Sequence, residues 1–182
     1  MRTVLREFLK IFILAIAIFF LLQTTIQTSV VVGISMEPSV HQGQRLIVNK
    51  VVYRFYQPER GDVIVLHPPN NQGEDHIKRI IAIPGDTVEV KMGEVYVNGL
   101  QLDEPYIKDS PKYTFHQIKM PENEYFVLGD NRNNSSDSHN VGTLPRQNIV
   151  GKAWLSIWPR DRWGLAPNYP LQEQIDSQTN NK

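Results

Sequence analysis

The stretch Thr87–Gly99, TVEVKMGEVYVNG, decides the class of the fold. Its two runs, TVEVK and EVYV, alternate apolar with other residues at the period of two that is typical of a strand with one buried face. A turn lies between them at Met92-Gly93, and Asn98-Gly99 begins the next reversal. The stretch therefore predicts a pair of antiparallel strands.

Similar short runs recur along the chain between turn residues, and no long stretch with a helical period competes with them. This spacing is typical of an all-β domain. The further strands that we predict cover residues 45–48, 62–67, 77–83, 125–128 and 149–158.

The composition narrows the class of function. The chain has 182 residues, enough for one soluble domain of about 140 to 150 residues with a short segment at each end. Nineteen basic residues balance nineteen acidic ones and are scattered, so we expect no nucleic-acid partner. Cysteine is absent, which excludes a thiol nucleophile, a disulfide framework and a cysteine-based zinc site.

An apolar run near the N-terminus, residues 11–22 (IFILAIAIFFLL), follows the basic residues Arg2, Arg6 and Lys10. A cleaved signal peptide would look similar but should end in a small-x-small site such as Ala-x-Ala, and the stretch QTTIQTSVVVG that follows Leu22 contains no alanine. We therefore expect an uncleaved, single-pass signal-anchor, with its N-terminus in the cytoplasm and the chain after residue 30 outside it.

The expected organisation has three parts. Residues 1–30 form the cytoplasmic N-terminus and the membrane anchor, and residues 31–168 form an extracytoplasmic β-rich domain. Residues 169–182 form a polar tail, because their last dozen residues carry too few apolar groups to pack.

A candidate nucleophile, Ser35, lies just after the anchor in GISMEPS, residues 33–39. A serine hydroxyl needs a nearby base, and Lys78 is one candidate. Strand alternation places Lys78 on the face of Ile80 and Ala82 and its neighbour Arg79 on the opposite face. A lysine base needs its pKa lowered by about 3 units, which a dry, apolar site could supply. The alternative is that both cations lie in solvent on an edge strand.

His139, in Asp137-Ser138-His139, is the second candidate base and would give a serine-histidine-aspartate relay. An aspartate and a histidine in a loop rich in Asn and Ser are also ordinary turn residues. By residue chemistry alone, histidine is the more usual base.

The order of four segments favours lysine instead. SMEPS at 35–39, GDVIV at 61–65, IKRIIAIPGD at 77–86 and GDNRNNSSDS at 129–138 follow an apolar anchor. Together they resemble the four characteristic boxes of type I signal peptidases, which are membrane-anchored Ser-Lys endopeptidases that remove signal peptides from exported proteins. The continuation GDNRNNSSDSHN is similar to the cyanobacterial and thylakoid-type branch.

The resemblance implies a coiled antiparallel sheet or partial barrel and a mechanism that needs neither metal nor cofactor. It makes Ser35 the nucleophile and Lys78 the general base, and it implies that Ser135 hydrogen-bonds the lysine amine and holds it toward Ser35. The reaction would pass through an acyl-enzyme.

Other positions carry over as supporting residues. Arg79 and Asp130 are expected to form an ion pair that orients the last box, which also contains Asp137. The backbone N–H of Ser35 is expected in the oxyanion hole. The chain departs from the pattern at Gly33, where some members have a serine that adds a hydroxyl donor. It departs again at His139, where many have an arginine paired with the aspartate.

The same comparison suggests residues that line small pockets for substrate side chains, with ordinary core packing as the alternative: Met36, His76, Ile77, Val127 and Leu128. The expected partners are preprotein signal peptides with small residues at positions −3 and −1, membrane lipid and the export translocon. Trp154, Trp158 and Trp163 are either core residues or lipid contacts. The expected location is the cell membrane or a thylakoid membrane.

Two other functions fit parts of the sequence. One is a non-catalytic, membrane-tethered β module that binds extended peptides. The other is a self-cleaving repressor-type Ser-Lys peptidase, but its DNA-binding N-terminal domain is replaced here by an apolar segment.

Overall fold

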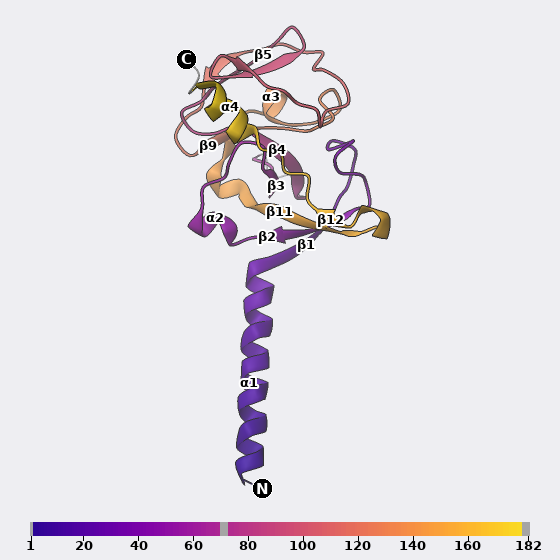
Figure 1. The fold of residues 1–182 in the computed structure, drawn as a ribbon, viewed down its shortest axis with the longest axis vertical. Coiled ribbons are helices and arrows are strands. Elements are labelled where there is room, and N and C mark those ends of the chain that lie inside the picture. Colours follow the sequence, from indigo (N-terminus) through magenta and orange to yellow (C-terminus); the bar gives the residue numbers. More distant parts are fainter. Residues whose placement is uncertain (1, 70–72, 180–182) are drawn as a thin grey trace.

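A computed structural model describes residues 2–69 and 73–179. One long helix, α1 (Arg2–Thr25), carries a β-rich body at its C-terminal end (Figure 1). Its segment Arg6–Thr25 has a mean hydropathy of 2.2 and is not buried by the rest of the chain. This segment is long and apolar enough to cross a bilayer, as predicted from its core, residues 11–22.

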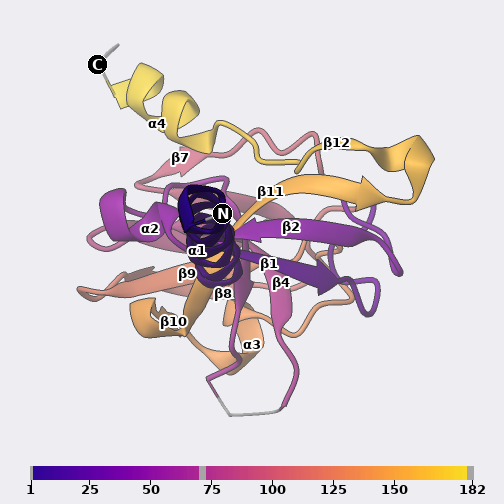
Figure 2. The same cartoon turned by 90° about the horizontal axis from the view of Figure 1, so that it is seen from below.

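The larger sheet has eight antiparallel strands in the order β1-β2-β11-β3-β4-β9-β10, with β12 paired to β11. Their bounds are β1 (Ile26–Val30), β2 (Arg45–Asn49), β3 (Val63–Leu66), β4 (His76–Ala82), β9 (Glu124–Leu128), β10 (Leu144–Pro145), β11 (Ile149–Trp158) and β12 (Gly164–Leu165). The sheet lies across the end of α1 and coils around the centre of the body (Figures 1 and 2). The prediction of an all-β domain with a coiled antiparallel sheet is confirmed.

The smaller sheet contains the predicted strand pair. Its order is β7-β6-β5-β8, with bounds β5 (Thr87–Lys91), β6 (Glu94–Val97), β7 (Leu100–Gln101) and β8 (Phe115–Lys119). β5 and β6 pair from Val88↔Val97 to Lys91↔Glu94. Met92 and Gly93 form the turn, both with positive φ (52° and 80°), a geometry typical of a tight hairpin.

Two longer strands, β1 and β8, were not predicted. β1 has the sequence IQTSV and follows the apolar helix without a break, so its polar residues resemble the end of the anchor. It pairs with β2 along its whole length, so the helix ends at Thr25 and residues 26–30 form a strand of the larger sheet. β8 has the sequence FHQIK and leaves most of its residues partly exposed, so it shows little alternation.

The prediction of a polar, unpacked tail does not hold for residues 171–179, which form the helix α4 (Leu171–Thr179). Leu171 and Ile175, one helical turn apart, are 0% and 4% exposed and join the core cluster of the smaller sheet. Gln174 bonds both the N–H and the carbonyl of Asp103. Two apolar residues at helical spacing are enough to hold this helix against the domain, because the surface that they contact is apolar. The segment is nevertheless polar on average.

The remaining helices are short: α2 (Val52–Phe55), α3 (Ser138–Val141) and the 3₁₀ turns η1 (Arg146–Asn148) and η2 (Arg160–Arg162). α3 matters for the site because it closes the loop that follows β9. A second core cluster, which contains Met36, Val40 and Ile77, packs beneath the segment after β1. The fold thus brings that segment, β4 and the loop after β9 together.

Candidate active site

Ser35 lies in a turn that follows β1. Its neighbour Met36 is buried, and the N–H of Val40 donates to the carbonyl of Met36 at 2.9 Å. The carbonyl of Ser35 accepts from the N–H of Asn131 at 3.0 Å. Gly33 has φ of +85°, a conformation that favours glycine, and an added Cβ there would meet open space. The backbone around Ser35 is thus fixed on the inner side and open on the outer side.

Lys78 reaches Ser35 from β4, where it pairs opposite Ile64 of β3. Its Nζ lies 2.9 Å from Ser35 Oγ and 3.0 Å from the carbonyl oxygen of Ile77. The side chain is buried, with 4% of its surface exposed. The structure therefore brings the predicted nucleophile and the predicted base into hydrogen-bonding contact.

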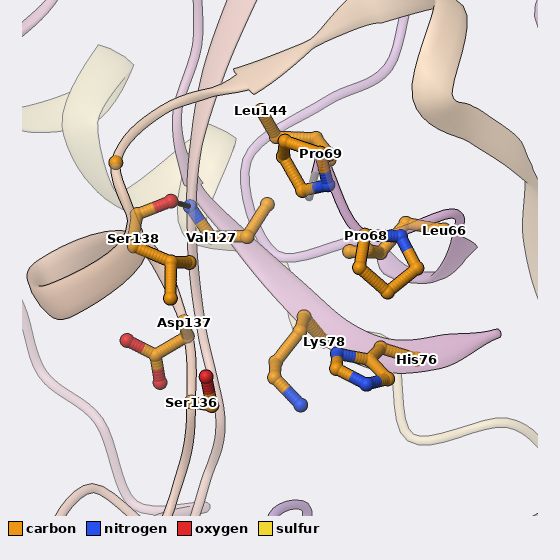
Figure 3. Close-up of a pocket in the computed structure, with 12 residues that line it drawn as sticks. Leu66, Pro68, Pro69, His76, Lys78, Val127, Ser136, Asp137, Ser138 and Leu144 are labelled. Atoms are coloured by element: carbon orange, nitrogen blue, oxygen red, sulfur yellow. Dashed lines mark hydrogen bonds between the residues drawn. The ribbon is translucent and has the colours of Figure 1, made fainter. Parts of the chain in front are cut away.

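Burial lowers the pKa of Lys78 to about 8, although the carboxylates of Asp137 and Asp130 oppose the change. Figure 3 shows the cavity beside the lysine stem. Its volume is about 30 Å³, room for about one water molecule. It is lined mainly by apolar groups, with the polar exceptions His76, Lys78, Ser136, Asp137 and Ser138. This mostly apolar packing explains the desolvation of the amine.

Arg79 is also buried, so the alternative of two solvent-exposed cations is wrong. The expected alternation fails because both faces of β4 are covered and its pairing with β9 shifts between Ile80 and Ala82. Arg79 forms the predicted ion pair with Asp130 through two bonds of 2.8 and 2.7 Å. It also donates to the carbonyls of Gly61 and Pro167.

The ion pair lies under an aromatic ring. The guanidinium carbon of Arg79 is 4.0 Å from the ring centre of Tyr106, whose hydroxyl donates to Glu104. Glu104 in turn accepts two hydrogen bonds from Arg132 of the last box. Sequence reasoning missed Tyr106 and Glu104, because nothing in the intervening loop marks them as neighbours of either arginine.

Ser135 does not make its predicted contact. Its Oγ is buried without a hydrogen-bond partner among the described residues, while the Lys78 amine contacts Ser35 and Ile77. Ser135 packs instead on Gly129, where an added Cβ would lie 2.3 Å from Ser135 Oγ and 2.4 Å from the Ser35 carbonyl oxygen. Ser136, which the sequence reasoning passed over, lines the cavity beside Lys78 (Figure 3).

Asp137 and His139 form a pair of their own. Asp137 is buried, accepts from the N–H of Gly129 at 2.9 Å and caps α3. The Nδ1 of His139 lies 2.6 Å from Asp137 Oδ1, and its ring stacks on Tyr113 at 3.9 Å. Within residues 2–69 and 73–179, the base that contacts Ser35 is therefore Lys78.

An open groove of about 330 Å³ leads to Ser35 and Lys78. One wall is the segment 30–36 and the other is the segment 74–78, with Asn134 and Ser136 beside them. Of the five predicted pocket residues, Met36, His76 and Ile77 line this groove.

The other two predicted pocket residues lie elsewhere. Val127 lines the small cavity beside Lys78, and Leu128 is fully buried in the core, so its prediction as a pocket residue is wrong. Leu128 points into the core cluster because it lies one residue along the strand from Val127. The missed groove residues Val30, Val32 and Ile34 are exposed apolar side chains at alternate positions, a signal present in SVVVGIS.

Comparisons with known proteins identify the family of this chain. A model of the signal peptidase family, peptidase S26, matches residues 5–158. A probable signal peptidase I-1 of Synechocystis sp. is 49% identical over 137 residues, which cover 71% of this chain and 70% of that protein. Signal peptidase I of Leptolyngbya laminosa is 47% identical over 137 residues, 71% of this chain and 68% of that protein.

A crystal structure of a signal peptidase I from Enterococcus faecalis has a TM-score of 0.46 and 32% identity, over 53% of this chain and 97% of that chain. The family match spans most of the sequence, and the non-catalytic and repressor-type alternatives are not favoured. The chain therefore belongs to the signal peptidase family, peptidase S26, in its cyanobacterial branch, and is a membrane serine peptidase that acts on the signal peptides of preproteins.

Proposed function

We propose that Ser35 and Lys78 form the catalytic dyad of this signal peptidase. The observation that carries the proposal is the 2.9 Å contact between Lys78 Nζ and Ser35 Oγ at a buried amine whose pKa is lowered to about 8. A neutral amine accepts a proton, whereas an exposed lysine stays charged at neutral pH.

In the proposed reaction, neutral Lys78 takes the Ser35 hydroxyl proton as Oγ attacks the carbonyl carbon of the scissile peptide bond. The backbone N–H of Ser35 stabilises the resulting oxyanion, and Gly33 leaves that side of the turn open. Lys78 then protonates the leaving amine, and the signal peptide remains as an ester on Ser35. Lys78 next takes a proton from water, which attacks the ester and restores the hydroxyl.

The pH dependence follows from the state of Lys78. At pH 6 only about one molecule in a hundred carries the neutral amine if its pKa is about 8. We expect kcat/KM to rise about tenfold per pH unit up to about pH 8 and then to level off. Initial rates of cleavage of a preprotein between pH 5.5 and 9.5 measure this rise of kcat/KM with pH. A flat profile below pH 8 would contradict the assignment of the base.

The groove supports binding of the substrate as an extended chain. Its walls are a strand edge and an adjoining segment, which offer main-chain partners and side-chain pockets. We propose that Met36 and Ile77, which line the groove, contact the small side chains at positions −1 and −3. We further propose that the export translocon delivers the preprotein to this groove.

The proposed topology has α1 as a single span, with its N-terminus in the cytoplasm because of Arg2, Arg6 and Lys10. We propose that the peptidase domain comprises the predicted residues 31–168 together with β1, which pairs with β2, and α4, which packs on the smaller sheet. It lies outside the cytoplasm at the cell membrane or a thylakoid membrane.

Membrane lipid is the second proposed partner. Trp154, Trp158 and Trp163 are each about half exposed, and their strands and turns lie on the side of the body where α1 joins it (Figure 1). Tryptophan favours the membrane interface. In proteoliposomes with brominated lipid, we expect quenching of the fluorescence of these three tryptophans, the only ones in the chain. Unquenched emission would exclude this orientation.

Cleavage itself tests the proposed dyad directly. Purified full-length protein in detergent is incubated with a preprotein, and mass spectrometry locates the cut. We expect one cut after a small residue at −1, and we expect none with Ser35→Ala. Equal cleavage by the Ser35→Ala protein would remove Ser35 from the mechanism.

A further inference from the structure

The strands next to the anchor have one face in the core and one face outside it. β1 continues directly from α1, and β1, β2 and β11 lie side by side across the end of that helix (Figures 1 and 2). Leu46, Val48 and Ala153 are fully buried in a core cluster. Their neighbours along each strand therefore point to the opposite, outer face, which Figure 2 shows from the N-terminal end of α1.

Large apolar side chains are exposed on this outer face. Trp158 of β11 pairs opposite Arg45 of β2, and Leu165 of β12 pairs opposite Leu155 of β11. Trp154 and Trp158 are 49% and 56% exposed, and Leu165 is 77% exposed. A patch of this kind marks an interaction surface, and tryptophan favours the interface of a bilayer. Because α1 arrives from the same side, the partner that fits this face is the membrane that holds α1.

The same segments carry an excess of positive charge. The whole chain is balanced and β1 has no charged residue, but residues 45–56 and 154–165 contain five basic residues and one acidic residue. The five are Arg45, Lys50, Arg54, Arg160 and Arg162. Within residues 2–69 and 73–179, only Arg162 of these five has a carboxylate partner, Asp161 at 3.9 Å. The other charges are thus available to an anion outside the chain.

Three of the arginines lie next to the exposed tryptophans. Arg45 is paired with Trp158, and Arg160 and Arg162 are in the turn η2, which links β11 to β12. The guanidinium carbon of Arg160 lies 5.6 Å from the ring centre of Trp163. All three arginines, here called the arginine cluster, are exposed. A guanidinium can donate two parallel hydrogen bonds to a phosphate, which a tryptophan ring beside it cannot do.

We propose that the arginine cluster binds the phosphate groups of anionic lipids and so holds the outer face of the sheet on the bilayer. This inference rests on the proposed contact of the tryptophans with lipid and names the class of headgroup. A bilayer of zwitterionic lipid offers the tryptophans the same apolar interior, but it lacks the negative surface charge that attracts arginine. The groove wall, residues 30–36, continues directly from β1. Attachment of this face therefore also sets the position of Ser35 relative to the membrane.

Tryptophan quenching in two kinds of proteoliposome tests the inference. Both contain the same amount of brominated acyl chains, but one has about one third phosphatidylglycerol and the other has phosphatidylcholine alone. At low salt, we expect the quenched fraction of the fluorescence of the full-length protein to be at least about twofold greater in the anionic vesicles. We expect this ratio to approach one at about 0.5 M NaCl, because salt screens the attraction.

A triple variant tests the cluster itself. In Arg45→Gln with Arg160→Gln and Arg162→Gln, we expect at least half of the excess quenching in anionic vesicles to be lost at low salt. The matched control replaces three exposed lysines of β8 and of the loop before it, Lys108→Gln with Lys112→Gln and Lys119→Gln. β8 pairs with β5, which lies at the end of the body away from α1 (Figure 1). The control should keep the ratio of the wild type.

The outcomes separate the two proposals. Equal quenching of the wild-type protein in both vesicles at low salt overturns the binding of anionic lipid, although the tryptophans then still contact the bilayer. A triple arginine variant that keeps the wild-type ratio also overturns it. Absence of quenching in both vesicles refutes the proposed lipid contact itself, and this inference with it.

Discussion

Replacing Lys78 with methionine is expected to lower kcat on a preprotein by about 10³-fold or more at pH 8. Methionine keeps an unbranched apolar stem in the cavity beside Leu66 and Val127 but removes the amine. Ser35 would then have no base to take its proton. We expect KM to change little, because the groove walls remain in place. Single-turnover cleavage assays measure the effect.

The control for this prediction is His139→Ala. The His139 ring contacts Asp137 and Tyr113, so its loss should reduce kcat by less than about tenfold, through the loop that Asp137 caps. A protein that loses cleavage with His139→Ala but keeps it with Lys78→Met would restore the serine-histidine-aspartate relay. Circular dichroism of both variants shows whether either loss reflects misfolding.

The contact between Ser35 and Lys78 was predictable because the chemistry of these residues and the order of the boxes along the chain coincide. Period-two alternation identified β5, β6 and most of β4, and the four boxes fixed which serine and which lysine to pair. Alternation could not show that both faces of β4 are covered. It therefore assigned only one of the two cations, Lys78 and Arg79, to the interior, whereas both are buried.

Errors at single residues arose where the direction of a side chain depends on tertiary contacts. Ser135 and Ser136 are adjacent and chemically alike, and only the approach of Gly129 to the Ser35 backbone decides which one lines the cavity of Lys78. Val127 and Leu128 are a similar case, since one strand step separates a cavity wall from the core.

Segments of mixed composition were missed for a related reason. α4 is polar on average, and its stability depends on Leu171 and Ile175 meeting an apolar surface built by the distant smaller sheet. The hydrogen bond from Gln27 to Asp75 joins residues 48 positions apart, so no local sequence pattern predicts it. Local sequence patterns therefore predicted the strands and the residues of the site. The contacts that orient these residues depend on the tertiary structure and could not be predicted from those patterns.

The second large effect is expected from Asp130→Ala, which should lower the free energy of unfolding by about 3 to 5 kcal/mol. Asp130 is 0% exposed, and its two oxygens accept hydrogen bonds from Nε and Nη2 of Arg79. Without it, a guanidinium that is also fully buried loses its counter-charge and two acceptors. Urea unfolding of the full chain in detergent, followed by tryptophan fluorescence, measures the loss.

A double variant separates two contributions to the free energy of unfolding: the cost of leaving the buried Arg79 without a counter-charge, and the stabilisation by the ion pair itself. Arg79→Met with Asp130→Leu removes both charges and fills part of the same volume, so we expect it to recover at least about half of the stability lost by Asp130→Ala. Recovery should be incomplete, because the carbonyls of Gly61 and Pro167 lose the donor that Arg79 supplies. A loss below about 1 kcal/mol in Asp130→Ala would mean that water or local rearrangement reaches Arg79. The loop from residue 129 to 137 would then be held mainly by Asp137 and Arg132.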